Sequence, residues 1–446
     1  MNLLILPATR PLRGDVTLPG DKSLSHRAAL FAALTHGESR VANFLDAGVT
    51  RPLLAALRGL GVPWRLEGNT LTLSGKGLRG LPRPATPPTL DCGHSATTMR
   101  LLAGMLAAAG LPAVLDGSPG LRRRPMRRVT HPLRLMGVPI ADTDGHAPLT
   151  LQARPPTQPL HGLTYTLPVA SAQVKTALLL AALAAPQPTT LTEPGPSRDH
   201  TERLFQAMGL PLTQPAPHTV RLTPPLPPTL PPLRLTLPGD ISSAAFLLTA
   251  GLLVPGSRLT LRRVLLNPTR TGFLDALRRM GARLTVTPRG ETYHEPYGDI
   301  TVEHTPDLHG ITVRGDLVVR MVDEFPAFAV LAAAARGETR VQDAAELRHK
   351  ESDRIAAIVT RLRALGVDAS AQADGFRIRG GRGWHGQVFD AAGDHRIAMA
   401  FAVAGLAAQS PLTVRGAEII DQSFPTFAAT LRALGAAVET TGEGQP

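Results

Sequence analysis

Basic side chains recur where the sequence predicts that helices begin. In chain order they are Lys22 and Arg27 at the first such helix, Lys175 at the third, Lys350 and Arg354 at the fifth, and Arg396 at the sixth. A helix N-terminus already carries partial positive charge, so added cations are unfavourable there unless an anion lies among them. Phosphate and carboxylate groups are the anions that such groups bind best. The pattern therefore predicts a site for polyanionic ligands.

Carboxylates accompany these cations in two segments. Asp323 and Glu324 lie in Met321-Val-Asp-Glu-Phe-Pro326, and Glu351 and Asp353 lie in His349-Lys-Glu-Ser-Asp-Arg354. Charged neighbours can shift pKa values far enough for proton transfer near neutral pH. Salt bridges that hold the loops are the structural alternative, and for Asp353 we prefer that alternative.

The charge of the chain allows a nucleic-acid-binding protein without favouring one. Its 446 residues carry a formal net charge of +12, but the basic residues are scattered rather than gathered in a tail. Aromatic residues are only 4%, so bases would find few stacking partners. Of the 47 basic residues only four are lysines, at positions 22, 76, 175 and 350. These few lysines are informative, because arginine cannot replace a compact, titratable ammonium.

Several other classes of protein are disfavoured. Cys92 is the only cysteine, which excludes an intramolecular disulfide and a multi-cysteine zinc site. The N-terminal apolar run Leu3–Leu6 is short and has no basic residue before it, unlike a signal or transit peptide. The longest apolar stretches, such as Leu101–Leu115, are too short for a membrane span. We therefore expect a soluble cytoplasmic protein.

A supersecondary unit is repeated six times along the chain. Each repeat has a helix-like segment closed by a glycine and followed by a strand-like segment, and the glycines stand at positions 61, 137, 209, 281, 366 and 435. A second helix, rich in Ala and Leu, follows a loop of Gly, Asp, Ser or Pro in each repeat. These loops are at 20–23, 91–95, 170–173, 239–242, 322–324 and 393–396. Units of about 70 to 80 residues are too large for a solenoid of small repeats.

The repeats also form two larger halves. Leu18-Pro-Gly-Asp21-x-Ser23 returns as Leu237-Pro-Gly-Asp240-x-Ser242, about half a chain later. We therefore predict two lobes of three units each, with the chain crossing between them near residues 20 and 238. Such lobes would enclose a cleft that can close.

Seven motifs together resemble the 5-enolpyruvylshikimate-3-phosphate (EPSP) synthase family, the 3-phosphoshikimate 1-carboxyvinyltransferases. They are Pro19-Gly-Asp-Lys-Ser-Leu-Ser-His-Arg27, Leu121-Arg-Arg-Arg-Pro-Met126, Val169-Ala-Ser-Ala-Gln-Val-Lys175, Ser197-Arg-Asp-His-Thr-Glu202, Asn267-Pro-Thr-Arg-Thr-Gly272, Lys350-Glu-Ser-Asp-Arg354 and Asp394-His-Arg-Ile-Ala-Met399. The resemblance implies an α/β fold of two inside-out α/β barrel domains, the enolpyruvyl transferase fold, each built from three βαβαββ units. The lobes would be 1–20 with 239–446, and 21–238, with the active site in the cleft between them.

The resemblance also implies a reaction. The enolpyruvyl group of phosphoenolpyruvate is transferred to the 5-hydroxyl of shikimate 3-phosphate, with release of phosphate, on the route to chorismate and the aromatic amino acids. The family needs no metal and no organic cofactor for this addition–elimination through a tetrahedral ketal phosphate. A monomer is the expected form of the protein.

Site residues follow by matching motifs. Shikimate 3-phosphate would be bound by Lys22, Ser23, Arg27, Ser171, Ala172, Gln173, Ser197, Asp323 and Lys350. Phosphoenolpyruvate would be bound by Lys22, Ala96, Arg124, Gln173, Arg354 and Arg396. The resemblance implies that Asp323 takes the proton of the 5-hydroxyl, and that Lys22 and Glu351 move protons to and from the enolpyruvyl methylene.

The chain departs from the family pattern at four positions. His94 and Glu346 stand where Asn is usual, and Gln422 stands where many members have Lys, which removes a cation expected at the phosphoenolpyruvate site. Ala96 replaces a usual Gly in that site, and its methyl predicts tolerance of the competing inhibitor glyphosate.

Two alternatives remain open at this point. The sister enzyme that transfers enolpyruvyl to UDP-N-acetylglucosamine carries Asn after the first Lys, where this chain has Ser23, and usually a reactive Cys that Gly117-Ser-Pro-Gly120 lacks. A basic RNA-binding or RNA-processing protein built on the same repeat is the second alternative.

Overall fold

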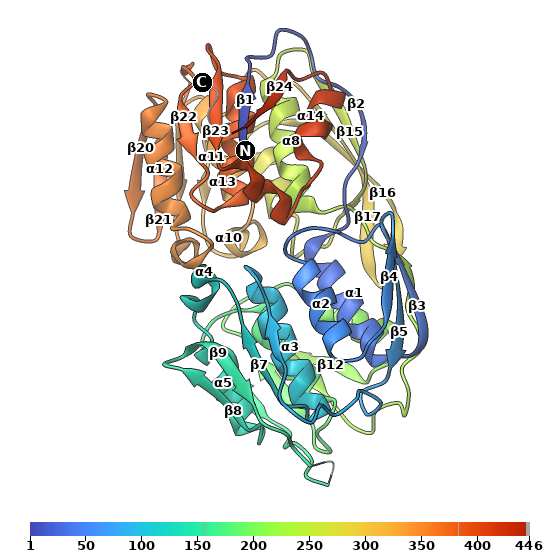
Figure 1. The fold of residues 1–446 in the computed structure, drawn as a ribbon. Coiled ribbons are helices and arrows are strands. Elements are labelled where there is room, and N and C mark those ends of the chain that lie inside the picture. The colour runs from blue at the N-terminus through green and yellow to red at the C-terminus, as the bar shows by residue number, and fades with distance from the viewer. Residues whose placement is uncertain (156, 382, 443–446) are drawn as a thin grey trace. The chain divides into compact units, whose positions relative to one another are not determined.

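A computed structural model describes residues 1–155, 157–381 and 383–442 (Figure 1). The chain divides into two compact units. Unit 1 comprises Met1–Pro19, Pro238–Gly290 and Pro296–Pro446, and unit 2 comprises Gly20–Leu237 and Glu291–Glu295. No helix of the described residues is long and apolar enough to cross a membrane.

The strands of the described residues form six four-stranded sheets, three in each unit. In spatial order, the sheets of unit 2 are β14(Arg234–Thr236)-β3(His36–Ala42)-β5(Thr70–Lys76)-β4(Trp64–Glu67), β6(Thr89–Asp91)-β7(Ala113–Asp116)-β9(His146–Leu151)-β8(Ile140–Thr143), and β10(Thr164–Thr166)-β11(Thr189–Thr192)-β13(Thr219–Leu222)-β12(Leu212–Ala216). Those of unit 1 are β2(Arg13–Thr17)-β15(Arg258–Leu265)-β17(Glu295–Glu303)-β16(Arg283–Thr292), β18(Thr312–Val313)-β19(Glu338–Val341)-β21(Gly375–Arg379)-β20(Asp368–Gln372), and β22(Val388–Asp390)-β23(Leu412–Arg415)-β1(Asn2–Ile5)-β24(Val438–Thr441).

All six sheets share one strand order. The first two strands are parallel, for example β6 with β7, and the third strand is antiparallel to the second, as β9 is to β7. A parallel pair needs a crossover, and where its strands are neighbours in sequence a helix supplies it, as α3(Ala96–Ala109) does between β6 and β7. The succession β6-α3-β7-α5-β8-β9, with α5(Arg127–Leu135), is the predicted βαβαββ unit. The six repeats predicted from the sequence and the α/β fold of βαβαββ units that the resemblance implies are therefore confirmed.

Three of the sheets are completed by strands distant in sequence. β2 pairs with β15 in unit 1, and β14 pairs with β3 in unit 2. Each of β2 and β14 is the last strand that the chain forms in its unit before it crosses into the other unit. The N-terminal strand β1 pairs with both β23 and β24, which closes the sixth repeat. Residues 291–295, the tip of the β16–β17 hairpin, belong to unit 2, where His200 Nδ1 lies 2.7 Å from Glu295 Oε1.

Six helices, which we call the inner helices, are buried on nearly all sides. They are α1(Lys22–Leu34), α3 and α6(Ala172–Ala182) in unit 2, and α8(Ile241–Leu253), α11(Phe325–Ala334) and α13(His395–Leu406) in unit 1. Apart from a few polar or charged residues, most of them in the first turns, they are apolar on all sides, which suits a helix surrounded by protein. Packing is close: a Cβ added at Gly104 of α3 would lie 2.3 Å from the carbonyl oxygen of Ala177 in α6. The inner helices match the Ala/Leu-rich segments predicted from sequence.

Six further helices bury only one side and end at the predicted glycines. They are α2(Arg51–Gly59), α5, α7(His200–Ala207), α9(Gly272–Arg279), α12(Arg354–Ala364) and α14(Phe427–Ala433). The glycine two residues after each helix has a φ between 76° and 105°, which explains the choice of residue. Short helical turns connect other segments: α4(Pro119–Arg122), α10(Asp316–Arg320), η1(Ala345–His349) and η2(Ala417–Gln422).

Candidate active site

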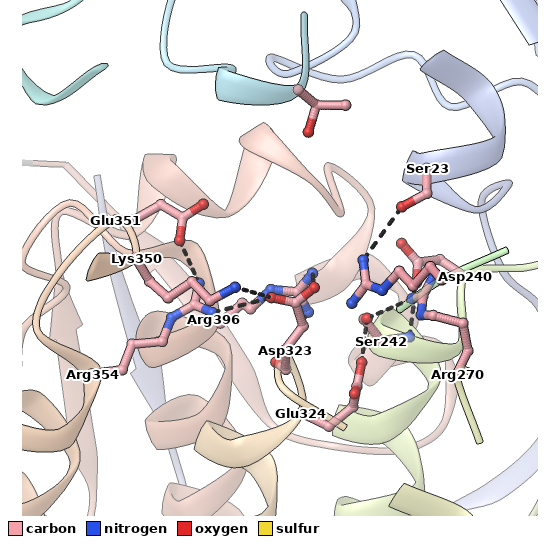
Figure 2. Close-up of polar contacts among 12 residues, drawn as sticks. Ser23, Asp240, Ser242, Arg270, Asp323, Glu324, Lys350, Glu351, Arg354 and Arg396 are labelled. Atoms are coloured by element: carbon pink, nitrogen blue, oxygen red, sulfur yellow. Dashed lines mark hydrogen bonds and ion pairs between the residues drawn. The ribbon is translucent and has the colours of Figure 1, made fainter. Parts of the chain in front are cut away.

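In unit 1, the carboxylate of Asp323 faces three cations. Asp323 lies directly before Glu324, the N-cap of α11. Its Oδ1 atom is 3.4 Å from NH1 of Arg354 and 3.8 Å from Nζ of Lys350, and its Oδ2 atom is 3.9 Å from NH2 of Arg396 (Figure 2). Each of these contacts is an attraction between opposite charges. Asp323 is therefore the centre of a cluster of opposite charges in unit 1.

A buried ion pair fixes Arg354, one of these cations. Arg354 is 0% exposed, and its Nε donates to Asp394 Oδ2 at 2.9 Å while its NH2 donates to Glu351 Oε2 at 2.7 Å. Burial opposes the charge of Arg354, but the nearby carboxylates, Asp394 first, outweigh it and raise the pKa of Arg354. Burial likewise opposes the charge of Asp394, but Arg354 holds the pKa of Asp394 below its usual value. Asp394 Oδ1 also accepts the backbone N–H of Arg396 at 3.0 Å, so the same carboxylate holds the Arg354 guanidinium and caps α13.

Glu324 takes part in a second cluster of unit 1. Its Oε1 atom accepts a hydrogen bond from the hydroxyl of Ser242 in α8 (Figure 2). NH2 of Arg270 donates to the same hydroxyl at 3.0 Å and lies 3.5 Å from Oδ1 of Asp240, the N-cap of α8. All four residues are buried, so this cluster ties the start of α8 to the start of α11.

In unit 2, the first turns of α1 hold three of the predicted residues. Lys22 is the first residue of α1, and the Ser23 hydroxyl accepts a hydrogen bond from NH1 of Arg198 at 3.4 Å. Arg27, one turn further, is 2% exposed and donates to the hydroxyls of Thr176 and Thr201, each at 2.9 Å. Burial lowers the pKa of Arg27 to about 10, so the side chain stays charged at neutral pH.

Gln173 of α6 is oriented by its neighbours. NH1 of Arg100 donates to Gln173 Oε1 at 2.7 Å, and Gln173 Nε2 donates to the Thr97 hydroxyl at 2.8 Å. NH2 of Arg100 donates to the carbonyl of Pro125 at 2.9 Å. Pro125 follows Arg124, so Arg100 orders Gln173 and the loop that carries Arg124 together.

Ser171 and Ser197 share one carboxylate. Ser171 is the N-cap of α6, directly before Ala172, and Ser197 lies between β11 and α7. The backbone N–H of Ser171 donates to Glu193 Oε1 at 2.9 Å, and the Ser197 hydroxyl donates to Glu193 Oε2 at 2.8 Å. The loops before α6 and before α7 are thereby joined.

Two expectations about the cations need correction. Lys350 and Arg354 do not lie at the fifth inner helix, α11: Lys350 lies in the loop before α12, and Arg354 is the first residue of α12. Tertiary packing places both side chains beside the carboxylate of Asp323. Lys175 does lie in α6, but its Nζ is buried 2.6 Å from Glu193 Oε2 and 2.5 Å from Glu202 Oε1. Its charge serves an internal ion pair rather than an anionic ligand.

Reasoning from the sequence missed Arg100, Glu193 and Arg198, although the sequence carries a signal for Arg100. Arg100 is the only charged residue within α3, as Lys175 is within α6. A single charge inside an otherwise apolar helix predicts a buried polar partner. Glu193 and Arg198 have no comparable signal, because nothing in their neighbours shows that they face Ser171, Ser197 or Ser23.

The four unusual residues have different surroundings. Ala96 is the first residue of α3 and only 2% exposed, whereas His94 and Glu346 are exposed. Gln422 ends η2, and its Oε1 atom is buried and has no hydrogen-bond partner within the described part of the chain.

Comparisons with known proteins agree over nearly the full length. The family model of EPSP synthase (3-phosphoshikimate 1-carboxyvinyltransferase) matches residues 6–431. A 3-phosphoshikimate 1-carboxyvinyltransferase of Roseiflexus sp. (strain RS-1) is 48% identical over 434 residues, which cover 95% of this chain and 98% of that one. The enzyme of the same name from Acidithiobacillus ferrooxidans (strain ATCC 53993 / BNL-5-31) is 46% identical over 444 residues, 98% of either chain.

Solved structures show the same relationship. EPSP synthase from Acinetobacter baumannii matches with a TM-score of 0.88 and 39% identity, covering 99% of this chain and 100% of that chain. The enolpyruvyl transferase NikO from Streptomyces tendae has a TM-score of 0.79 and covers 99% of each chain, but at 22% identity it supports the fold alone. With six βαβαββ units and the family's motifs gathered at their helix N-termini, the chain belongs to the EPSP synthase (3-phosphoshikimate 1-carboxyvinyltransferase) family.

Proposed function

We propose that this chain transfers the enolpyruvyl group of phosphoenolpyruvate to the 5-hydroxyl of shikimate 3-phosphate and releases phosphate. Both substrates are polyanions, in keeping with the cations around Asp323 and at the start of α1. Membership of the EPSP synthase family supports this reaction over the other two candidates.

The observation that carries the proposal is the arrangement around Asp323. Its carboxylate lies within 3.9 Å of Lys350, Arg354 and Arg396, which come from two different segments of unit 1. A carboxylate alone would repel an anionic substrate, and cations alone could not accept a proton. Their combination allows one site to bind an anion and to deprotonate a hydroxyl.

The proton steps follow from these roles. Asp323 accepts the proton of the 5-hydroxyl while the oxygen of that hydroxyl bonds to C2 of phosphoenolpyruvate. Lys22 or Glu351 supplies a proton to C3. The resulting tetrahedral ketal phosphate then returns a proton from C3 to Lys22 or Glu351 as the bond from C2 to the phosphate oxygen breaks. The proton held by Asp323 passes to the departing phosphate, so each residue regains its starting protonation state and no oxidation state changes.

The remaining residues bind and orient the two substrates. We assign shikimate 3-phosphate to Lys22, Ser23, Arg27, Ser171, Ala172, Gln173, Ser197, Asp323 and Lys350. We assign phosphoenolpyruvate to Lys22, Ala96, Arg124, Gln173, Arg354 and Arg396. The two sets draw on both units, and we take the lobes 1–20 with 239–446, and 21–238, as the two domains of a monomeric cytoplasmic enzyme.

Phosphate release with alternative acceptors tests the reaction. The purified protein is incubated with phosphoenolpyruvate and either shikimate 3-phosphate or UDP-N-acetylglucosamine, and phosphate is measured over time. We expect release only with shikimate 3-phosphate. Release only with UDP-N-acetylglucosamine would identify the sister reaction. Tight, salt-dependent retention of RNA in a filter-binding titration, without any phosphate release, would favour the RNA-binding alternative.

Substitution of Asp323 tests its assigned role. Asp323→Asn keeps the size of the side chain but removes the base, and we expect kcat to fall about 100- to 10,000-fold. Asp353→Asn is the matched control, since Asp353 caps α12 through the Ala356 N–H and pairs with Arg348. Asn also caps helices well, so this control should retain near-normal kcat. Equal activity of the two variants would exclude Asp323 as the base.

A further inference from the structure

Glu193 of unit 2 connects two residues that the proposed function assigns to shikimate 3-phosphate. Its Oε1 atom accepts the backbone N–H of Ser171 at 2.9 Å, and its Oε2 atom accepts the hydroxyl of Ser197 at 2.8 Å. Ser171 precedes α6, whereas Ser197 lies in the segment between β11 and α7. A single carboxylate thus fixes the spacing of two loops that are separate in sequence.

The carboxylate of Glu193 is itself held rigidly. Glu193 directly follows β11, and its side chain is only 3% exposed. Nζ of Lys175 donates to Glu193 Oε2 at 2.6 Å and pairs with Glu202 Oε1 at 2.5 Å. Burial opposes the charge of Lys175, but Glu202 and Glu193 outweigh it and raise the pKa of Lys175, so the ammonium persists at neutral pH.

Lys175 also compensates the negative charge of Glu193 beside the proposed ligand site. An anion next to a phosphate-binding loop would repel the ligand, and a buried carboxylate without a partner is costly. The ammonium at 2.6 Å compensates the charge of Glu193 locally. The loops therefore gain a strong, charge-assisted acceptor without exposing an unbalanced negative charge to the ligand.

We infer that Glu193, fixed by Lys175, is a positioning residue for shikimate 3-phosphate: it holds Ser171 and Ser197 in the arrangement that binds this substrate. The inference rests on the proposed function and goes beyond it, because Glu193 is not among the assigned ligand-binding residues. It acts only through the two serines. Its loss should therefore affect the shikimate 3-phosphate site and leave phosphoenolpyruvate binding largely unchanged.

Steady-state kinetics of Glu193→Gln test the inference. Gln keeps the shape of the side chain and one acceptor oxygen. Its NH2 group cannot accept a hydrogen bond from the Ser197 hydroxyl or form an ion pair with the Lys175 ammonium. We expect KM for shikimate 3-phosphate to rise about ten- to a hundredfold, the range of a lost hydrogen bond to a charged group. KM for phosphoenolpyruvate should change less than about threefold. A purely structural role would instead reduce the active fraction, and so apparent kcat, without a selective change in one KM.

Asp299→Asn provides a matched control in unit 1. Asp299 also ties a backbone N–H to cations, accepting from Arg263 N at 3.0 Å and from NH1 of Arg262 at 2.8 Å, and these partners are not among the assigned residues. We expect both KM values of this variant to remain normal. If Glu193→Gln and Asp299→Asn have the same kinetic constants, the inference is wrong.

A second variant covers the case in which Glu193→Gln does not fold. Glu193→Asp keeps the charge for Lys175, but its shorter side chain cannot reach both serines, so the same selective rise in KM is expected. A folded Glu193→Asp enzyme with normal KM for shikimate 3-phosphate would overturn the inference.

The test also separates this inference from the proposed function. Wild-type turnover with shikimate 3-phosphate is measured first, and its absence would refute the proposed function alone. In that case calorimetric titration of wild type and Glu193→Gln with shikimate 3-phosphate still decides the role of Glu193. Tighter binding by wild type supports that role, and equal binding or none by either protein contradicts it.

Discussion

Arg354 and Asp394 form a fully buried ion pair that joins the first residue of α12 to the N-cap of α13. The distance from Arg354 Nε to Asp394 Oδ2 is 2.9 Å, and both side chains are 0% exposed. The ion pair also contacts Asp323, since Arg354 NH1 lies 3.4 Å from Asp323 Oδ1. The stability of this part of unit 1 and the orientation of the candidate base therefore depend on the same arginine.

Removal of the Asp394 charge should destabilise the protein strongly. Asp394→Asn leaves the Arg354 guanidinium buried and less well compensated, which typically costs about 3–5 kcal/mol. Urea unfolding monitored by circular dichroism at pH 7 measures the difference from wild type. A loss below about 1 kcal/mol would show that Glu351 and Asp323 compensate Arg354 without Asp394.

The same variant predicts a pH dependence. The pKa of Asp394 is lowered in the folded protein, so the stabilisation is fully present above its ordinary value of 3.8 and is lost as pH falls below it. The difference in unfolding free energy between wild type and Asp394→Asn should stay constant from pH 7 to 5. This difference in unfolding free energy should become smaller below pH 4. A difference that grows there would contradict the lowered pKa of Asp394.

Lys22→Met should abolish turnover. Methionine keeps the length of the side chain but removes the ammonium charge and the proton that the proposed mechanism uses at the start of α1. Phosphate release is measured beside Lys76→Met, which makes the same substitution at an exposed lysine of β5. We expect normal activity from the control, and near-normal activity from a folded Lys22→Met protein would exclude the assigned role.

Shikimate 3-phosphate should raise the melting temperature. A ligand that binds only the folded protein adds about 2.7 kcal/mol of stability at a hundredfold excess over Kd. Differential scanning fluorimetry with millimolar ligand measures the shift, and shikimate without the phosphate is the control. An unchanged melting temperature with intact shikimate 3-phosphate would count against binding by Ser23, Arg27 and Lys350.

Ala96 should make the enzyme tolerant of glyphosate. Its methyl group, buried at the first position of α3, should project into space that glycine leaves open in the family. Overpacking costs about 1–3 kcal/mol, which corresponds to roughly one to two orders of magnitude in inhibitor affinity. Glyphosate inhibition is compared between wild type and Ala96→Gly at fixed phosphoenolpyruvate. If Ala96→Gly is no more sensitive, the methyl group is not the cause.

The repeating architecture could be predicted because it depends on local features. Apolar segments such as Phe325–Ala334 form helices that must be surrounded by protein, and glycines such as Gly281, with a φ of 82°, end the amphipathic helices. These signals recur in each of the six repeats, so the order of the two longer helices in each repeat follows from the sequence. The pairing of β2 with β15, which are distant in sequence, could not be predicted in the same way. Short strands of similar composition could pair equally well with strands nearer in the chain.

The site was predictable only in part. The sequence by itself determined which residues carry charge at helix N-termini, among them Lys22, Asp323 and Arg396, because the residue types and their motifs are local. Only the tertiary structure decided what those charges do. Packing brings Lys350 and Arg354 from the start of α12 to Asp323, and it buries Lys175 between Glu193 and Glu202. Partner choice among charges depends on distance and burial, and neither quantity can be derived from positions along the chain.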